Sequence, residues 1–537
     1  MNFLRKNSIV GLALTFLVLL VAVPLMGQEL RTASEESNFE NYTSYEEMME
    51  FMQQVQGRST EMVLSSFGKT IEGRLQPYAI LSRPLITQPW EAFASGKPVV
   101  LLNANIHGGE RTLRESLLML LRDLATAGSE ENKLLDDMVI LVVPSINPDG
   151  FVRASRGNSA GLDLNRDFIK LEQPATWNYA HNILLKWQPH IYMDGHNGGA
   201  YPYNICYESP AHAATNLRLI NICDEEIFPY ISERMEEHGY QAWYYSGGNR
   251  TAWRGGSPEA RDNTNYGGFF NSISILFESP SQDRAAGAKS GYVASRALLE
   301  YIAANADKVM NYVSWARRET IELGQKAQGD IAIEVTRGPM DYKVSYLIAE
   351  GRGADRQIIE VTDADLIIKP VVTKSRPRPY AYILEARAYK AVALLKKHSI
   401  TIEVLQEDIE LDIEAYNMTG IQRRSVYDHP GSVSVTCDNA MIKRKQTFKK
   451  GSYVVRTGQM QGRLVTQLLE PETSDNVLTW NTMDAILPRS PGRSFDPKIV
   501  EGQDRSRSNR PAIIPIFKLM TPMALPMQIW KQDDTGN

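Results

Sequence analysis

The sequence predicts an α/β protein: a mainly parallel, mixed sheet with helices on both faces, followed by β-rich accessory units. Short apolar runs such as residues 99–106 and 138–143 are bounded by turn-forming or polar residues, which is typical of buried parallel strands. Leucines at helical spacing lie between these runs, and alternating strands and helices build parallel sheets. After about residue 330, short strand-like runs replace the helical spacing.

The first half of the chain supplies its elements in a regular order. Residues 99–106 predict a buried strand, and a helix follows directly, because leucines recur at helical spacing at Leu113, Leu117, Leu120, Leu121 and Leu124. The segment from Asn147 to Gly150 reads Asn-Pro-Asp-Gly and predicts a turn. The other predicted elements are helices over residues 45–55, 177–186 and 294–327 and strands over residues 138–143, 190–193 and 272–277.

The second half of the chain is predicted to be rich in strands, forming one or two accessory units. Strands are predicted over residues 331–335, 344–349, 358–361, 400–403, 409–416, 452–455 and 463–468. The Arg-Pro-Arg-Pro run at residues 376–379 predicts a loop or joint, and residues 507–537 receive no assignment. The predicted division of the chain is therefore residues 1–27, 28–328 and 329–537.

The first 27 residues are typical of a secretory signal peptide. Arg5 and Lys6 precede an uncharged apolar run over residues 9–26, and Gly27 precedes a polar segment. The run approaches the length that spans a bilayer, but Pro24 favours cleavage over a continuous spanning helix. A cleaved signal and an uncleaved anchor would both export the body of the protein. We therefore expect a periplasmic or secreted protein with no membrane contact after cleavage.

Composition and cysteine content argue against several classes of site. The net charge is −5 and no basic run with interleaved aromatic residues occurs, so nucleic acid is not an expected partner. An odd number of cysteines in an exported protein leaves at least one thiol free, although Cys206 and Cys223 could pair with each other and leave Cys437. No Cys-x-x-Cys pair occurs, so no structural zinc knuckle is expected.

Three residues of the types that zinc prefers follow predicted buried strands. His107 and Glu110 are separated by two glycines, which let the backbone bend sharply. His196 follows a later strand and supplies a third ligand, which leaves one coordination position for water as in catalytic zinc sites. Alone, each pattern also fits a solvated His–Glu pair or a loop histidine. His190 is a competing ligand, but it lies at the amino end of its strand, away from the edge where sites form.

A second group of residues is suited to binding a carboxylate. Asn165 and Arg166 are adjacent, and an arginine gives bidentate, charge-assisted bonds to a carboxylate while an asparagine adds a donor. Either Arg153 or Arg156, a few residues earlier, could face developing oxyanion charge. A surface turn with ordinary ion pairs is the alternative interpretation.

Glu278 is an acid at the end of an apolar strand, where a carboxylate is locally out of place. Burial raises the pKa of such a group towards neutral pH, which suits a general base. A strand-end acid that faces solvent is the alternative.

Six motifs occur in one order along residues 40–320: His-x-x-Glu, Asn-Pro-Asp-Gly, Arg-x-x-Arg, Asp-Leu-Asn-Arg, Asp-x-His-x-Gly and Phe-Glu. This order resembles the zinc metallocarboxypeptidase family of the carboxypeptidase A type. The resemblance is specific because all six motifs keep one order and most follow strands. The accessory region resembles the C-terminal domains of bacterial secreted members.

The resemblance implies the metal site and the base. His107, Glu110 and His196 match the zinc ligands, and Glu278 matches the general base that deprotonates the attacking water. The His-Glu-x-x-His signature of other zinc peptidases does not occur in this sequence.

The resemblance also implies how substrate is held. Arg153, the first of the Arg-x-x-Arg pair, matches the arginine that polarises the scissile carbonyl, with Arg156 as the competing choice. Asn165 and Arg166 match the pair that binds the terminal carboxylate, and Asp163 matches a carboxylate that orients a zinc histidine. The family also has a mobile tyrosine over the substrate, for which the sequence leaves three candidates: Tyr244, Tyr245 and Tyr266.

The function expected from these residues is an exported metallocarboxypeptidase. It would use zinc-activated water to hydrolyse the last peptide bond of peptides with a free C-terminal carboxylate. The alternatives are an amidase of the same fold that acts on cell-wall peptide stems and a non-catalytic peptide-binding module. The sequence leaves the oligomeric state open.

Overall fold

The computed structural model describes residues 29–351, 353–492 and 511–530. The predicted signal peptide, residues 1–27, lies outside the described residues. Within them, no helix combines the length and the apolar character needed to cross a membrane.

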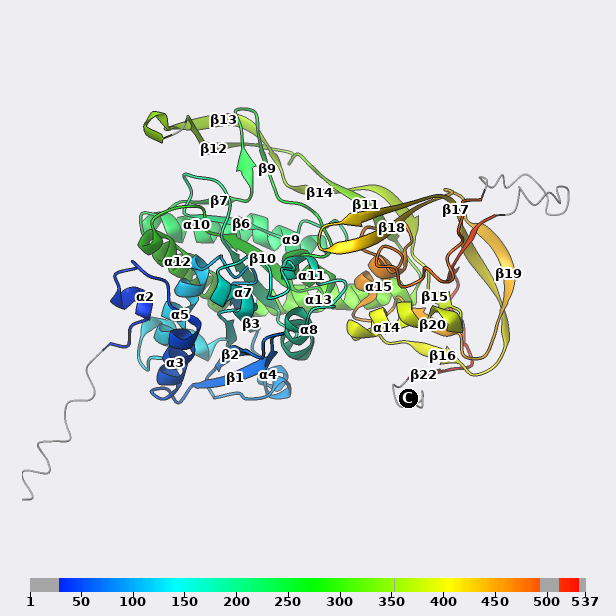
Figure 1. The fold of residues 1–537 in the computed structure, drawn as a ribbon, viewed down its shortest axis with the longest axis horizontal. Coiled ribbons are helices and arrows are strands. Elements are labelled where there is room, and N and C mark those ends of the chain that lie inside the picture. The colour runs from blue at the N-terminus through cyan, green and yellow to red at the C-terminus, as the bar shows by residue number, and fades with distance from the viewer. Residues whose placement is uncertain (1–28, 352, 493–510, 531–537) are drawn as a thin grey trace, which may run out of the picture.

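An eight-stranded mixed sheet forms the centre of the first half of the chain (Figure 1). Its order is β1-β2-β4-β3-β5-β10-β6-β7, and four of its seven neighbouring pairs are parallel, which confirms the predicted mainly parallel sheet. The strands are β1 (Met62–Lys69), β2 (Leu75–Leu81), β3 (Val99–Ala104), β4 (Val139–Val143), β5 (Ile191–His196), β6 (Ile205–Glu208), β7 (Ala242–Tyr244) and β10 (Ile273–Glu278).

Helices cover this sheet on both sides, so its central strands are apolar on both faces. Val100 and Leu102 of β3 pack in one core cluster with the leucines of α5, whereas Val99 and Leu101 pack in the cluster on the other face. The longer helices of this half are α3 (Tyr45–Gln56), α5 (Thr112–Ala125), α10 (Phe228–Glu237), α12 (Arg284–Ala304) and α13 (Ala306–Gln325). The shorter ones are α2 (Ala33–Glu36), α4 (Pro89–Ser95), α6 (Glu130–Lys133), α7 (Pro148–Arg153), α8 (Pro174–Tyr179), α9 (Leu217–Ile222) and α11 (Asn263–Phe269).

The register of three parallel strands positions the site. In this sheet β3, β5 and β10 are neighbours, and Ala104 of β3 pairs with Gly195 of β5. His196 of β5 pairs with Glu278 of β10. The carboxyl ends of the three strands therefore lie side by side, and the segments that follow them meet at one edge of the sheet.

The second half of the chain is rich in strands and packs against the first. A short sheet joins β8 (Gly247–Gly248) and β9 (Ala252–Arg254) from the first half to β13 (Gln357–Ile367) and β12 (Lys343–Glu350), and β11 (Asp330–Gly338) pairs with β14 (Lys369–Pro377). Tyr382, Leu384 and Leu395 belong to the same core cluster as Val99 and Leu101, so one apolar core continues between the halves.

A larger sheet ends the chain, with the order β18-β17-β21-β15-β20-β16-β22 and with β19 paired to β17. Its strands are β15 (Ala381–Leu384), β16 (Glu403–Leu405), β17 (Ile409–Val426), β18 (His429–Cys437), β19 (Ile442–Phe448), β20 (Tyr453–Arg456), β21 (Ile513–Leu519) and β22 (Met527–Ile529). Two helices, α14 (Tyr389–Lys397) and α15 (Gly462–Leu469), pack with it.

Several predicted elements differ from the structure. The strand predicted over residues 463–468 is helix α15, because Leu464, Val465, Leu468 and Leu469 have a spacing that also fits one buried helix face. The single helix predicted over residues 294–327 is two helices, which meet where Asn305 leaves helical geometry at φ −131°. The turn predicted from Asn147 is the start of α7, because the Asn147 side chain accepts the Gly150 N–H and caps the helix.

Candidate active site and metal centre

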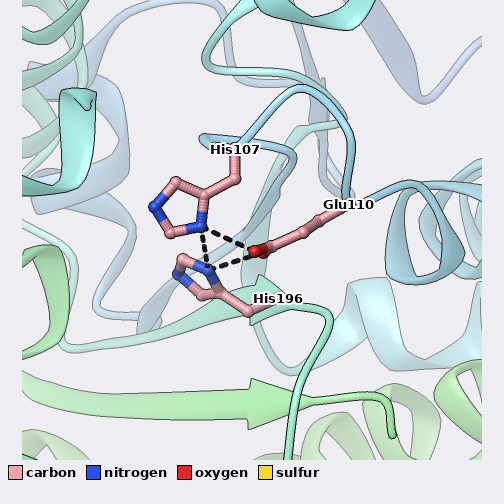
Figure 2. Close-up of side chains that lie close together, drawn as sticks. All are labelled: His107, Glu110 and His196. Atoms are coloured by element: carbon pink, nitrogen blue, oxygen red, sulfur yellow. Dashed lines mark hydrogen bonds and ion pairs between the residues drawn. The ribbon is translucent and has the colours of Figure 1, made fainter. Parts of the chain in front are cut away.

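The three predicted ligands converge at the carboxyl edge of the sheet (Figure 2). His107 Nδ1 lies 2.9 Å from Glu110 Oε1, His196 Nδ1 lies 2.9 Å from Glu110 Oε2, and the two Nδ1 atoms are 3.1 Å apart. The histidines are buried, and the acid is partly exposed. Of the residues described, these form the one cluster of three or more metal-ligand side chains.

The protonation of the histidines shows that this cluster fits a cation. His107 Nε2 lies 3.1 Å from Asp163 Oδ1, and His196 Nε2 lies 3.1 Å from Asp194 Oδ2, so each imidazole can donate its proton to a carboxylate. Both Nδ1 atoms then present lone pairs to each other and to the Glu110 carboxylate. Such acceptors repel one another unless a cation lies between them. Two nitrogens and one carboxylate oxygen are a catalytic zinc ligand set, with the fourth position open.

Arg156 supports this tautomer of His107. Its Nη1 lies 3.3 Å from His107 Nδ1, and because a guanidinium only donates hydrogen bonds, this contact favours the tautomer in which Nδ1 is the acceptor. The proton of His107 therefore lies on Nε2, facing Asp163. A carboxylate–histidine–metal arrangement of this kind fixes the ring and raises its basicity as a ligand.

The charges around the ligands favour a positive charge between them. Burial opposes ionisation of Glu110, but contacts with His107 and His196, when those rings are protonated, outweigh burial and hold its pKa far below its usual range. Burial also opposes protonation of His196, but the Asp194 and Glu110 carboxylates outweigh burial and raise its pKa well above its usual value. A proton or a metal ion can satisfy this demand, and only a metal ion can contact all three ligands.

The turn that carries His107 and Glu110 is fixed by close packing. A Cβ on Gly108 would lie 1.9 Å from the backbone carbon of Gly150, so only glycine fits there. Asn105, at φ 59°, donates from Nδ2 to the carbonyl oxygens of His107 at 3.1 Å and Glu110 at 2.8 Å. This asparagine was not singled out from the sequence, and it holds the turn in the shape that brings the two ligands together.

Glu278 lies beside the ligands at the end of β10. Its side chain is buried, and its Oε2 has no hydrogen-bond partner among the described residues. Burial raises the pKa of Glu278 to about 8, and nearby carboxylates add to this effect while His196 opposes it. A Cβ on Gly198 would lie 2.6 Å from Oε2, so glycine at that position leaves the space in front of the carboxylate open.

The two arginines of the Arg-x-x-Arg motif have different surroundings. Arg153, at the end of α7, pairs with Glu72 and does not line the cleft that contains the ligands. Arg156 lines that cleft, contacts His107, and lies 3.6 Å from Glu110 Oε1. Between them Ala154 adopts φ 51° and reverses the chain. The geometry therefore favours Arg156 over Arg153 for any role at the metal.

Asn165 and Arg166 both line the same cleft. Asn165 Oδ1 accepts the Asn263 N–H at 2.7 Å, which orients the amide. Arg166 is partly exposed, and its Nε lies 3.4 Å from Glu259 Oε2. Asp163 accepts hydrogen bonds from His107 and Arg156, as expected for a carboxylate that orients a ligand.

The structure separates the tyrosine candidates. Tyr245 lines the cleft, whereas Tyr244 packs in the core and the fully buried Tyr266 forms a hydrogen bond with His398 at 2.8 Å.

His190, the competing metal ligand, accepts the Val99 N–H at 3.1 Å, at the opposite end of the strands from the metal ligands.

The cysteines and one serine motif take no part in this site. Cys206, Cys223 and Cys437 are free, buried thiols. Residues 157–161 read Gly-Asn-Ser-Ala-Gly, the letters of a serine-hydrolase elbow, but they form a turn after α7 that Asn158 stabilises and not a strand–turn–helix junction.

Four acidic residues in or beside the site were not predicted. Asp194 stands two residues before His196 on β5, so both side chains share one face of the strand, and this spacing was a usable signal. Glu208 and Asp262 line the cleft without any local motif. Asp428, at the tip between β17 and β18, accepts the Asp163 N–H although the two residues are 265 positions apart. No local sequence pattern predicts such a contact.

Comparisons with known proteins agree with this site. The sequence model of the family described as zinc carboxypeptidase (Peptidase_M14) matches residues 48–330. Carboxypeptidase 2 of Trichophyton rubrum is 27% identical over 490 residues, which are 84% of this chain and 86% of that protein. Carboxypeptidase D of Mus musculus is 29% identical over 210 residues, 32% of this chain and 15% of that protein.

Solved structures also match. A carboxypeptidase A from Helicoverpa armigera matches with a TM-score of 0.41 and 18% identity over 56% of this chain and 81% of that one. A metallo-carboxypeptidase from Burkholderia cenocepacia matches with a TM-score of 0.40 and 20% identity over 49% and 69% of the two chains.

Substituting Asp194 tests the ligand geometry. In Asp194→Asn, His196 loses the carboxylate that fixes its tautomer, so we expect zinc affinity to fall by about 10- to 100-fold. Competition with a chromogenic chelator measures this affinity. The matched control is Asp137→Asn, an exposed acid before β4, which should bind zinc like the parent. Equal affinities in both variants would show that Asp194 does not support the ligand.

Proposed function

The chain belongs to the zinc carboxypeptidase family and is a metallocarboxypeptidase, and on that premise we propose which of its residues act on the peptide and how. The observation that carries the proposal is the convergence of His107, Glu110 and His196 beside the buried, unpartnered carboxylate of Glu278. We propose that residues 28–328 form the catalytic domain and residues 329–537 the accessory region. The family match over residues 48–330 and the start of β11 at Asp330 support this division.

The bond-breaking step needs a base and a site for negative charge. Zinc, when bound by the three ligands, supplies a Lewis acid that polarises a carbonyl and acidifies water. Glu278 accepts the proton of the attacking water and passes it to the leaving amine, because its Oε2 has no competing partner and faces the space left by Gly198. Arg156, beside His107, donates to the oxygen that becomes negative.

The terminal carboxylate of the peptide is held by Asn165 and Arg166. Both line the cleft, and the Arg166 guanidinium has a loose pairing at 3.4 Å with Glu259, so it can turn towards a ligand. A bidentate arginine–carboxylate contact restricts cleavage to the last residue of a chain. Asp163 acts indirectly, by orienting both His107 and Arg156.

We also propose that the protein is exported. The charged start and apolar run of residues 1–27 support a cleaved signal peptide and a periplasmic or secreted enzyme, and the accessory region resembles the C-terminal domains of bacterial secreted members. The intact mass of the protein from its native host tests this: a mass that includes Met1 contradicts cleavage.

Replacing the base tests the assignment of Glu278. Glu278→Gln keeps the shape of the side chain and removes its proton acceptor, so we expect kcat to fall by roughly 10²- to 10⁴-fold with little change in KM or zinc content. In the parent, kcat/KM should rise with pH as Glu278 loses its proton, and a bound cation lowers that pKa. Turnover that survives in the variant would place the base elsewhere.

The two neighbouring arginines form a matched pair of variants. Arg156→Met removes the donor beside the metal ligands, so we expect kcat to fall by roughly 10²- to 10³-fold. Arg153→Met removes only the contact with Glu72 and should leave kcat within about twofold of the parent. Zinc content is measured in both. If Arg153→Met is the damaged variant, the carbonyl contact belongs to Arg153.

Capture of the terminal carboxylate is tested with one peptide in two forms. Arg166→Ala should raise KM for the peptide with a free C-terminus by roughly 10- to 1,000-fold, because a desolvated charge pair is lost. Binding of the same peptide with an amidated end, measured by inhibition, should change little. Equal losses for both forms would contradict the carboxylate assignment.

A further inference from the structure

A buried ion pair between the two halves of the chain forms part of the cleft wall. Glu208 ends β6, the strand next to β10, and lines the cleft. Arg337, on β11, lies beyond the residues that the family model matches and donates from Nη2 to Glu208 Oε1 at 2.6 Å. The two side chains are 9% and 8% exposed. The accessory region therefore places a guanidinium directly behind the active-site cleft.

This pair is tightly built. The Gly256 N–H donates to Glu208 Oε1 at 2.6 Å, and Arg337 Nη1 donates to the Ile368 carbonyl at 3.0 Å. A Cβ on Gly255 would lie 2.6 Å from Arg337 Nη1 and 2.8 Å from Glu208 Oε1, so the loop packs on the pair with no room for a side chain. β11 and β14 run between the helices of the first half and the C-terminal sheet (Figure 1).

The pair lies where the last side chain of a peptide must go, an argument that rests on the proposed function. With the scissile bond at the metal ligands and the carboxylate at Arg166, the terminal side chain enters the remaining part of the cleft. Besides Glu208 and Glu278, the remaining lining comprises Asn197, Gly198, Tyr245, Ser246, Gly255, Gly256, Ser257, Glu259, Asp262, Thr264, Asn265 and Leu276. Among these, Glu259 already pairs with Arg166 and Arg261.

The charge of this wall depends on Arg337. Burial raises the pKa of Glu208, and Arg337 and the Gly256 N–H oppose this effect. Without Arg337, the side chain of Glu208 would stay ionised only if a lysine or arginine of the substrate took the place of the guanidinium, so the site would then favour a cationic side chain. Asp262 contributes less negative charge, because burial raises its pKa to about 7 even though Asn265 opposes this effect by donating from its backbone N–H at 2.8 Å and from Nδ2 at 2.9 Å. Behind the wall, burial similarly raises the pKa of Asp224 to about 7.

We propose that Arg337 is a specificity-determining residue: by neutralising Glu208, it makes the enzyme select peptides that end in an uncharged residue over peptides that end in lysine or arginine. The groups of this lining that can contact the side chain are the hydroxyl groups of Ser257 and Thr264 together with the apolar surfaces of Tyr245 and Leu276, because the Asn265 amide is already engaged by Ala211, His212 and Asp262. These suit an uncharged side chain that can form hydrogen bonds, such as glutamine.

Three N-blocked dipeptides that differ only in the last residue, Gln, Lys or Glu, test this proposal through kcat/KM. The parent should cleave the Gln peptide at least about tenfold better than the Lys peptide. Arg337→Met frees the Glu208 carboxyl group to pair with a cationic substrate side chain and should raise the Lys/Gln ratio by roughly tenfold or more. Arg337→Lys, which keeps the positive charge, should retain the preference of the parent.

Arg337→Met leaves a buried carboxylate without its partner, which destabilises the fold. Two further variants therefore test the proposal independently of Arg337→Met. Glu208→Gln keeps the shape of the side chain and leaves the guanidinium unopposed, so the peptide ending in Glu should gain relative to the Gln peptide. The double variant Glu208→Gln/Arg337→Met has neither charge and should show no gain for Lys. A parent that prefers Lys, or ratios that do not move in Arg337→Met and Glu208→Gln, would overturn the proposal. A parent that cleaves none of the three peptides would instead contradict the proposed function.

Discussion

Two histidine lone pairs and a carboxylate point at one another at the edge of the central sheet, and the active site is built around the cation that relieves their repulsion. This arrangement exists because β3, β5 and β10 are parallel neighbours in register, so that the segments after Ala104, His196 and Glu278 meet. A slip of one residue in β5 would turn His196 away from the ligands, because alternate side chains of a strand face opposite sides. The Asn105 contacts and the glycine at position 108 fix the remaining ligands.

The site residues that directly follow buried strands could be predicted from the sequence. Positions that depend on a local reversal of the chain, or on a contact with a distant part of it, could not. His107, Glu110, His196 and Glu278 could be found because apolar runs and chemically suited side chains coincide there. The different surroundings of Arg153 and Arg156 could not be predicted, because they depend on the left-handed Ala154 at the end of α7, which carries no signal in its residue type. Helix α15 has an apolar spacing that also fits a strand, and tertiary packing decides between them.

The accessory region contributes side chains that contact the residues of the active site. It shares an apolar core with one face of the catalytic sheet, and its hairpin tip brings Asp428 to the backbone of Asp163. It also supplies the guanidinium that pairs with Glu208 in the cleft wall. These contacts join residues more than 120 positions apart, so substitutions in the second half of the chain can change ligand orientation and side-chain preference in the first.

The most direct test of this account is the X-ray absorption spectrum of the zinc-loaded protein at the zinc edge. The account predicts two imidazole nitrogens at about 2.0–2.1 Å and a carboxylate oxygen at about 2.0–2.2 Å, with no sulfur in the first shell. In His196→Ala one imidazole should disappear from that shell, or zinc should be lost. A sulfur ligand, a third imidazole, or an unchanged spectrum in His196→Ala would contradict the convergence of His107, Glu110 and His196 on one metal ion.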